Sequence, residues 1–139
     1  MTMLEVTSGG GSAALRAAEA MLRTLGGESI TLLLPAMGMP SDAAAQLGLV
    51  DPGVEEVSVS PVVMRDLATE NNGPRRRMEF LLPGSAVAAL LAGRNVDSAR
   101  DFFDGVLGLV HDGELFHVEG VTGERFAGTT YLYRVVAVQ

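Results

Sequence analysis

The chain contains no cysteine and no lysine. The absence of cysteine excludes disulfide bonds, thiolate catalysis, cysteine-ligated zinc and iron–sulfur clusters. The absence of lysine excludes a P-loop lysine and Schiff-base chemistry, because all 10 basic residues are arginine. Any chemistry of this chain therefore rests on histidine, carboxylates, hydroxyls and arginine.

Long hydrophobic runs and an excess of positive charge are also missing. No apolar run approaches the roughly 18 residues of a membrane span, and the N-terminus lacks the basic region of a secretory signal. With 139 residues, 47% of them hydrophobic and 19% charged, the composition is typical of a single folded domain, 1–139. The net charge of -7 argues against a protein that grips nucleic acid by neutralising its phosphates. We therefore expect synthesis in the cytoplasm, no membrane partner, and at most the passage of DNA without specific binding.

The first 25 residues predict a flexible lead-in followed by a helix. Residues 1–11 end in "SGGG", which predicts flexibility, and Ser12 stands where the N-cap of a helix over 12–25 is expected. Glu19 and Arg23 form an i, i+4 pair on the polar face, and two glycines follow at 26 and 27. The apolar face of this amphipathic helix contains Ala14, Leu15, Ala18, Met21, Leu22 and Leu25.

The segment 29–83 predicts three strands separated by two long connections. A strand over 29–35 is followed by an excursion over 36–54 with a short helical stretch at 41–47. The alternating segment 55–67 predicts an edge or bulged strand, because Pro61 interrupts its register. Residues 68–74 predict a turn or mobile loop, and 75–83 predict a strand that pairs with 55–67 as a hairpin.

The remaining residues predict two short helices and three closing strands. Ser85 is expected to cap a helix over 86–93, and a second helix after Asn95 places Phe102 and Phe103 as anchors. Strands are expected at 106–111, 114–122 and 130–138. The fold class is therefore α+β and mainly β: a small antiparallel β-barrel or sandwich of about six strands with an N-terminal amphipathic helix and one or two short helices.

Both histidines of the chain lie in "LVHDGELFHVEGV", residues 109–121. Asp112 and Gly113 predict a type I′ turn, since such a turn needs positive φ at both central positions. Side chains alternate along a strand, so His111 and His117 are expected on opposite faces of the hairpin, where they cannot share a metal. We expect no metal site and no cofactor. The competing hypothesis is a small enzyme in which His117 and Glu119, two positions apart, share a face for acid–base chemistry.

Other motifs give weaker signals. No nucleophile elbow GxSxG is present, and none of the 17 acids is singled out as a glycosidase pair. "GGGS" at 9–12 has no strand before it and no GK[ST] after it, so a flexible leader is the better interpretation than a phosphate loop. "PRRR" at 74–77 is the only basic cluster. It is either a solvated loop end or a contact for phosphates or an acidic partner.

The segment "LVHDGELFHVEGVTGERFAGTTYLYRVVAVQ", 109–139, resembles the end of tailed-phage head–tail joining proteins. These head-completion or stopper proteins of the neck are small β-barrels that assemble as rings below the portal. The resemblance covers about 29–139 and is clearest over 106–138, while the helix at 12–25 and the helical stretch at 85–105 depart from it. It implies no catalytic residues, a virion location, and contacts with neck proteins on the portal or adaptor side and on the tail side.

A ring subunit of this kind needs surfaces for its neighbours. The predicted lumen or partner loop contains Glu70, Asn71, Asn72, Arg75, Arg76 and Arg77. The predicted subunit interface contains Arg16, Glu19, Arg23, Met37 and Met39. The alternatives to a stopper are another neck or tail component such as a tail terminator, the enzyme with His117 and Glu119, and a monomeric ligand-binding barrel.

Overall fold

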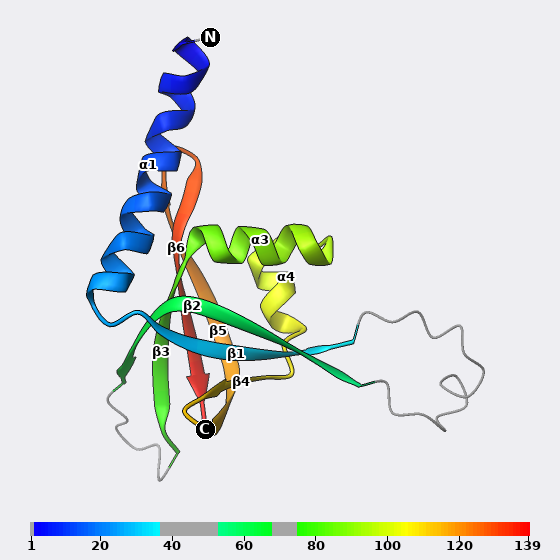
Figure 1. Cartoon of the computed structure of the whole chain (residues 1–139). Helices are drawn as coiled ribbons and strands as arrows, with labels where there is room; N and C mark the ends of the chain where they lie inside the picture. Colours follow the sequence, from blue (N-terminus) through cyan, green and yellow to red (C-terminus); the bar gives the residue numbers. More distant parts are fainter. Residues whose placement is uncertain (1, 37–52, 68–74) are drawn as a thin grey trace, which may run out of the picture.

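The computed structural model describes residues 2–36, 53–67 and 75–139, with side chains from residue 10 onward. Six antiparallel strands form a closed barrel in the order β1-β2-β3-β6-β5-β4, which confirms the predicted fold class and selects the barrel over the sandwich (Figure 1). The elements along the chain are α1 (Thr2–Thr24), β1 (Glu28–Pro35), β2 (Val54–Asp66), β3 (Arg77–Pro83), α3 (Gly84–Arg94), α4 (Ala99–Asp104), β4 (Gly108–His111), β5 (Glu114–Phe126) and β6 (Thr129–Val138).

Alternate residues of the strands fill the barrel interior. Phe80 of β3 and Phe116 of β5 meet at its centre, edge to face, with ring centroids 5.7 Å apart. Both rings are fully buried. The alternation of apolar and polar residues that predicted these strands thus places the apolar face of each strand in a common core. Other buried residues of this core are Ile30, Leu32, Leu34, Val59, Val62, Met78, Leu82, Leu109, Val135 and Ala137.

Strand β2 joins the two halves of the barrel. Its first part pairs with β1, and its last four residues pair with β3 as the predicted hairpin. The register shifts where Glu28 lies opposite Val62 but Ile30 lies opposite Val59, so β2 carries a bulge at Ser60 and Pro61. The prediction of a bulged strand is confirmed. The alternative of an edge strand is wrong, because the barrel closes and β2 is paired on both sides.

The hairpin β4–β5 follows the register expected from its turn. Asp112 and Gly113 have φ of 51° and 78°, the positive values of a type I′ turn. His111 lies opposite Glu114 and Leu109 opposite Phe116. Strand β5 continues to Phe126, four residues beyond the expected end, because it forms a long hairpin with β6.

Helix α1 begins at Thr2, so the prediction of a flexible lead-in over 1–11 and of Ser12 as N-cap is wrong. Ser12 lies inside the helix and is exposed. The glycines have a packing role instead. A Cβ added to Gly11 would overlap the hydroxyl of Thr129 in the β5–β6 hairpin, so only glycine lets the helix approach the hairpin this closely. Tertiary packing therefore outweighs the poor helix propensity of glycine here.

The C-terminal half of α1 covers the outer face of β6, β2 and β3, while its N-terminal end projects past the barrel (Figure 1). Ala18 and Leu22 are buried against this wall, as the apolar periodicity predicts. Met21 and Leu25, expected on the same buried face, are exposed to 44% and 61%. None of the helices that the structure describes has the length and hydropathy needed to cross a membrane.

Helices α3 and α4 connect β3 to β4. The prediction that Ser85 caps the first of them is wrong, because α3 begins at Gly84 and its N-cap is Pro83 with no side-chain cap bond. For α4, the Ser98 hydroxyl accepts a hydrogen bond from the Asp101 amide at 3.1 Å, and Phe102 and Phe103 are buried as predicted anchors. The expected helical stretch at 41–47 and the loop 68–74 lie outside the described residues.

Candidate functional site

A large apolar surface depression lies between α1 and the end of the β5–β6 hairpin. This helix–hairpin groove has a volume of about 510 Å³. Phe126, 58% exposed, forms part of its wall on the hairpin. Contiguous exposed apolar surface of this kind marks interaction sites in soluble proteins. The groove is lined by Gly10, Ala13, Ala14, Ala17, Ala18, Met21, Phe126 and Tyr131.

A stripe of residues on α1 and a bulge in β6 build the groove. Its helical residues recur at spacings of three and four, so they form one continuous stripe along α1. On the hairpin, Glu124 pairs with Leu132 and Arg125 with Thr130, which leaves Tyr131 as the extra residue of a bulge. A bulge redirects side chains, and here Tyr131 lines the groove beside the helix.

A second exposed apolar surface lies on β1, β4 and β5, and we call it the β4 patch. It consists of Leu33 and Leu115, which lie over Gly108; Leu33 is half-buried and Leu115 is 45% exposed. A Cβ on Gly108 would lie 2.7 Å from Cδ1 of Leu115 and 3.7 Å from Cδ1 of Leu33, so these side chains close over the glycine. In the barrel order β4 is farthest from β3, one of the strands under α1. The β4 patch and α1 therefore lie on opposite walls.

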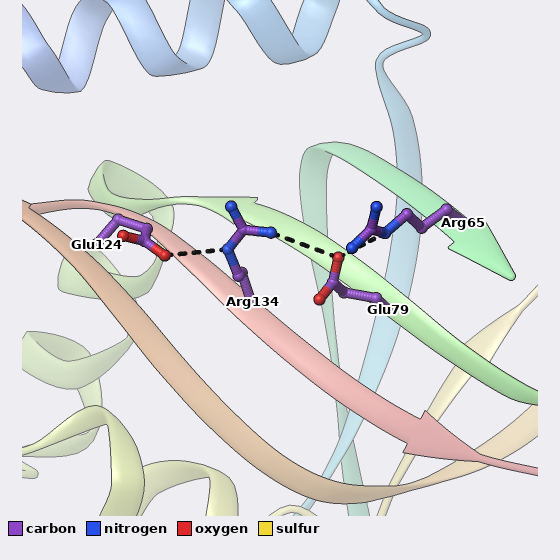
Figure 2. A network of polar contacts seen from close by, with 4 residues as sticks. All are labelled: Arg65, Glu79, Glu124 and Arg134. Atoms are coloured by element: carbon purple, nitrogen blue, oxygen red, sulfur yellow. Dashed lines mark hydrogen bonds and ion pairs between the residues drawn. The ribbon is translucent and has the colours of Figure 1, made fainter. Parts of the chain in front are cut away.

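Charged residues form a chain across β2, β3, β6 and β5 on the outside of the barrel (Figure 2). Arg65 Nε donates to Glu79 Oε1 at 2.8 Å, and Arg134 Nη1 lies 3.6 Å from the same oxygen. Arg134 Nε donates to Glu124 Oε1 at 3.0 Å. The Glu79 side chain is only 10% exposed, whereas that of Arg65 is 63% exposed. The network fixes a buried carboxylate between two arginines and links four strands.

Replacing Glu79 with glutamine is expected to lower the free energy of unfolding by about 1–2 kcal/mol. The reason is that Arg65 and Arg134 lose a largely buried carboxylate partner and regain only part of that interaction from water. Urea denaturation measures the change. Glu124→Gln is the matched control, since the Glu124 side chain is 40% exposed and Arg134 is its one ion-pair partner among the described residues; a loss of about 0.5 kcal/mol or less is expected. An equal loss of unfolding free energy in Glu79→Gln and Glu124→Gln would contradict a special role for the buried Glu79.

Within the predicted lumen or partner loop, Glu70, Asn71 and Asn72 lie outside the described residues. Arg75 is exposed and has no ion-pair partner in the part of the chain that the structure describes. The other two arginines bind acids of the barrel itself. Arg76 lies 3.3 Å from Asp66 and 2.7 Å from Glu114, and Arg77 lies 2.8 Å from Glu119. These guanidinium groups tie the ends of β2, β3 and β5 together.

The predicted subunit interface is only partly described, since Met37 and Met39 lie outside the described residues. On α1, Arg16 is exposed, and Arg23 lies 3.3 Å from Glu19 as the expected i, i+4 pair. Glu19 also accepts a hydrogen bond from the Ser85 hydroxyl at 3.3 Å, so this side of α1 contacts α3. The apolar groove lies on the opposite side of the helix and was not predicted.

His111 and His117 point to opposite faces, as predicted. His111 Nε2 lies 3.2 Å from Glu28 Oε1, and its ring is 6.4 Å from that of Phe80. His117 is exposed, and its expected partner Glu119 sits at a bulge where it binds Arg77 instead. No contact between His117 and Glu119 is present in the described structure. Within residues 2–36, 53–67 and 75–139, no cluster of three acids or histidines is arranged to hold a metal ion.

A sequence signal for the groove exists in retrospect: the alanines at 13, 14, 17 and 18 form a stripe of small side chains on one side of α1. Such a stripe permits close approach of another chain but does not identify it. Comparisons with protein-family models, with curated proteins and with solved structures found no match.

Proposed function

We propose that this protein is a structural subunit of a homo-oligomeric ring in the neck of a tailed phage or prophage, where the DNA-filled head joins the tail. The observation that carries the proposal is the helix–hairpin groove, which leaves a contiguous apolar surface open in a single copy. The assignment to the neck rests on the resemblance of residues 109–139 to head–tail joining proteins. A stopper is the position favoured by that resemblance, and a tail terminator is the alternative.

The placement of the two apolar surfaces supports a ring over a two-fold dimer. The groove lies beside α1, and the β4 patch lies on the opposite wall of the barrel. A subunit with two different complementary surfaces on opposite sides associates head to tail, and such contacts form a ring when the rotation between subunits closes. In this proposal the alanine stripe and Phe126 receive Leu115 of the next copy.

The remaining surfaces suit a subunit that lets DNA pass. The chain has a formal net charge of -7, and an acidic surface repels phosphates at short range. Among the described residues, six of the ten arginines bind carboxylates of the same chain, which leaves few of them for gripping DNA. Arg75 and the adjoining loop 68–74 are proposed to contact the neck proteins above or below the ring.

A pair of aspartate variants tests the head-to-tail arrangement. Phe126→Asp places a charge in the groove and Leu115→Asp places one in the β4 patch; each is expected to abolish rings, because a charge buried in an apolar contact is costly. When the two variants are mixed, one intact groove and one intact patch remain, so heterodimers are expected. Light scattering distinguishes the 14.5 kDa monomer, the dimer and the ring, and negative-stain images identify rings.

Leu25→Asp is the matched control, because Leu25 is 61% exposed and lies outside both apolar surfaces. Rings are expected to persist in this variant. Thermal unfolding of all three variants near the wild-type temperature checks that the fold is intact. A wild-type chain that stays monomeric and also fails to join DNA-filled heads to tails would reject the neck proposal.

A further inference from the structure

A smaller cavity lies on the other side of the β5–β6 hairpin, between its inner face and the start of α4. Its volume is about 240 Å³. We propose that this cavity binds a single phosphate group, held by Arg100 of α4 and Arg125 of β5. The site does not depend on ring assembly. The lining residues are Ala99, Arg100, Val121, Gly123, Arg125, Thr130 and Tyr133.

The pairing of the arginines singles out this cavity. In the part of the chain that the structure describes, six of the ten arginines have a carboxylate partner: Arg23, Arg65, Arg76, Arg77, Arg94 and Arg134. In the described structure Arg16, Arg75, Arg100 and Arg125 have none, and two of these four line the same cavity. Arg125 uses one nitrogen to donate to the Gly128 carbonyl at 3.3 Å, and the rest of its guanidinium has no acceptor among the described residues. Two guanidinium groups that line one cavity, with no acid among its lining residues, can hold an anion together.

Hydroxyl groups complete the lining. Thr130 and Tyr133 have no side-chain hydrogen bond to any described residue, so both hydroxyls retain their capacity to donate. Gly123 keeps the space between them open. A Cβ at this position would lie 2.8 Å from Cγ2 of Thr130 and 3.3 Å from Cε1 of Tyr133. Any larger residue would therefore fill or distort the cavity.

Size and geometry select the ligand. Pockets for drug-sized ligands begin at roughly 300 Å³, so a cavity of about 240 Å³ takes a single small group. Donor groups come from α4, β5 and β6, that is, from several directions. Such an arrangement suits the tetrahedral oxygens of a phosphate better than a planar carboxylate, which is matched by one guanidinium fork.

Acids beside the cavity lower its affinity for phosphate. An adjoining cavity shares Arg100 and Val121 and contains Asp104 and Glu119. Glu119 is bound by Arg77 at 2.8 Å, whereas Asp104 has no ion-pair partner among the described residues. Asp104 therefore competes with a bound anion for Arg100, and Asp104→Asn should strengthen binding.

Titration of the isotope-labelled full chain with inorganic phosphate, followed by NMR at constant ionic strength, tests the site. Saturable shifts are expected for amides near residues 99–101, 123–125 and 128–130. Arg100→Gln and Arg125→Gln should each weaken binding about tenfold or more, since each removes charge-assisted hydrogen bonds. Arg16→Gln, which removes the same charge from an arginine outside the cavity, should leave the affinity within about twofold, and Asp104→Asn should raise it severalfold.

Two further titrations identify the source of the phosphate. If a 5′-phosphorylated thymidine tetranucleotide binds more tightly than its unphosphorylated form, the ligand is the phosphate at the end of a DNA strand. If inorganic phosphate binds and neither tetranucleotide does, the ligand is the free ion. Acetate that saturates at the same concentration as phosphate would overturn the phosphate assignment. Shifts without saturation, or equal weakening by Arg16→Gln, would overturn the site itself.

Discussion

Replacing Phe80 with alanine is expected to lower the free energy of unfolding by about 3–5 kcal/mol, the largest effect that we predict for a single substitution. The Phe80 ring is fully buried in the barrel and meets Phe116 edge to face at 5.7 Å. Truncation removes the favourable transfer free energy of the ring and leaves a cavity in the core. The cavity cannot collapse readily, because β3 is paired with a strand on each side. A loss of this size is a substantial fraction of the roughly 5–15 kcal/mol that stabilises a domain.

Urea denaturation of the two proteins measures this effect, with the midpoint expected to fall and the slope to stay constant. Phe126→Ala is the control, because it makes the same chemical change at a side chain that is 58% exposed. Its effect on stability should stay within about 0.5 kcal/mol. A loss below about 1 kcal/mol for Phe80→Ala would mean that the barrel interior is not packed as described.

Gly84→Ala is expected to destabilise the protein at the upper end of the roughly 1–3 kcal/mol that overpacking costs. A Cβ on Gly84 would overlap the carbonyl oxygen of Thr130 and would lie 2.8 Å and 2.9 Å from C and Cα of Tyr131. These are backbone atoms of β6, so no side-chain rotation can relieve the contact. The start of α3 would have to move away from the barrel, and the buried Val87 would move with it.

The control for this variant lies in the same helix. Gly93→Ala adds the same methyl group where no atom lies within 4 Å, so it should stabilise the protein by up to about 1 kcal/mol through helix propensity. Thermal unfolding should therefore move in opposite directions for the two variants. A stabilised Gly84→Ala protein would show that α3 is not held against β6 as described.

The strands were predictable because the residues that define them act locally. Asp112 and Gly113 fix the turn, the turn fixes the register, and the register places Leu109 opposite Phe116 in the core. Ser98 and Asp101 likewise define the start of α4 within one turn of helix. The turn signal needs no knowledge of the rest of the chain, but a serine alone is not a sufficient cap signal, because Ser12 and Ser85 cap no helix.

The start of α1 and the helix–hairpin groove were not predictable, because they depend on contacts between distant segments. The glycine run that predicts flexibility in isolation is helical because Gly11 faces Thr129, more than a hundred residues away in the chain. Tyr131 lines the groove only because a bulge shifts its strand. Glu119 was expected beside His117, but another bulge and Arg77 redirect it. Pro61 signals the bulge in β2, but the bulges at Glu119 and Tyr131 and the long-range pairs have no comparable local signature.

The closure of the barrel has a consequence for how the chain folds. Strands β1 and β4 pair around Thr31 and Val110, so this seam of the barrel joins segments separated by more than half of the chain. Contacts of such high sequence separation form slowly, because the entropy of closing the long intervening loop is lost first. Until this seam forms, β1 and β4 each present an unpaired edge that can recruit another chain. Folding intermediates should therefore be prone to aggregation in a way that the closed native barrel is not.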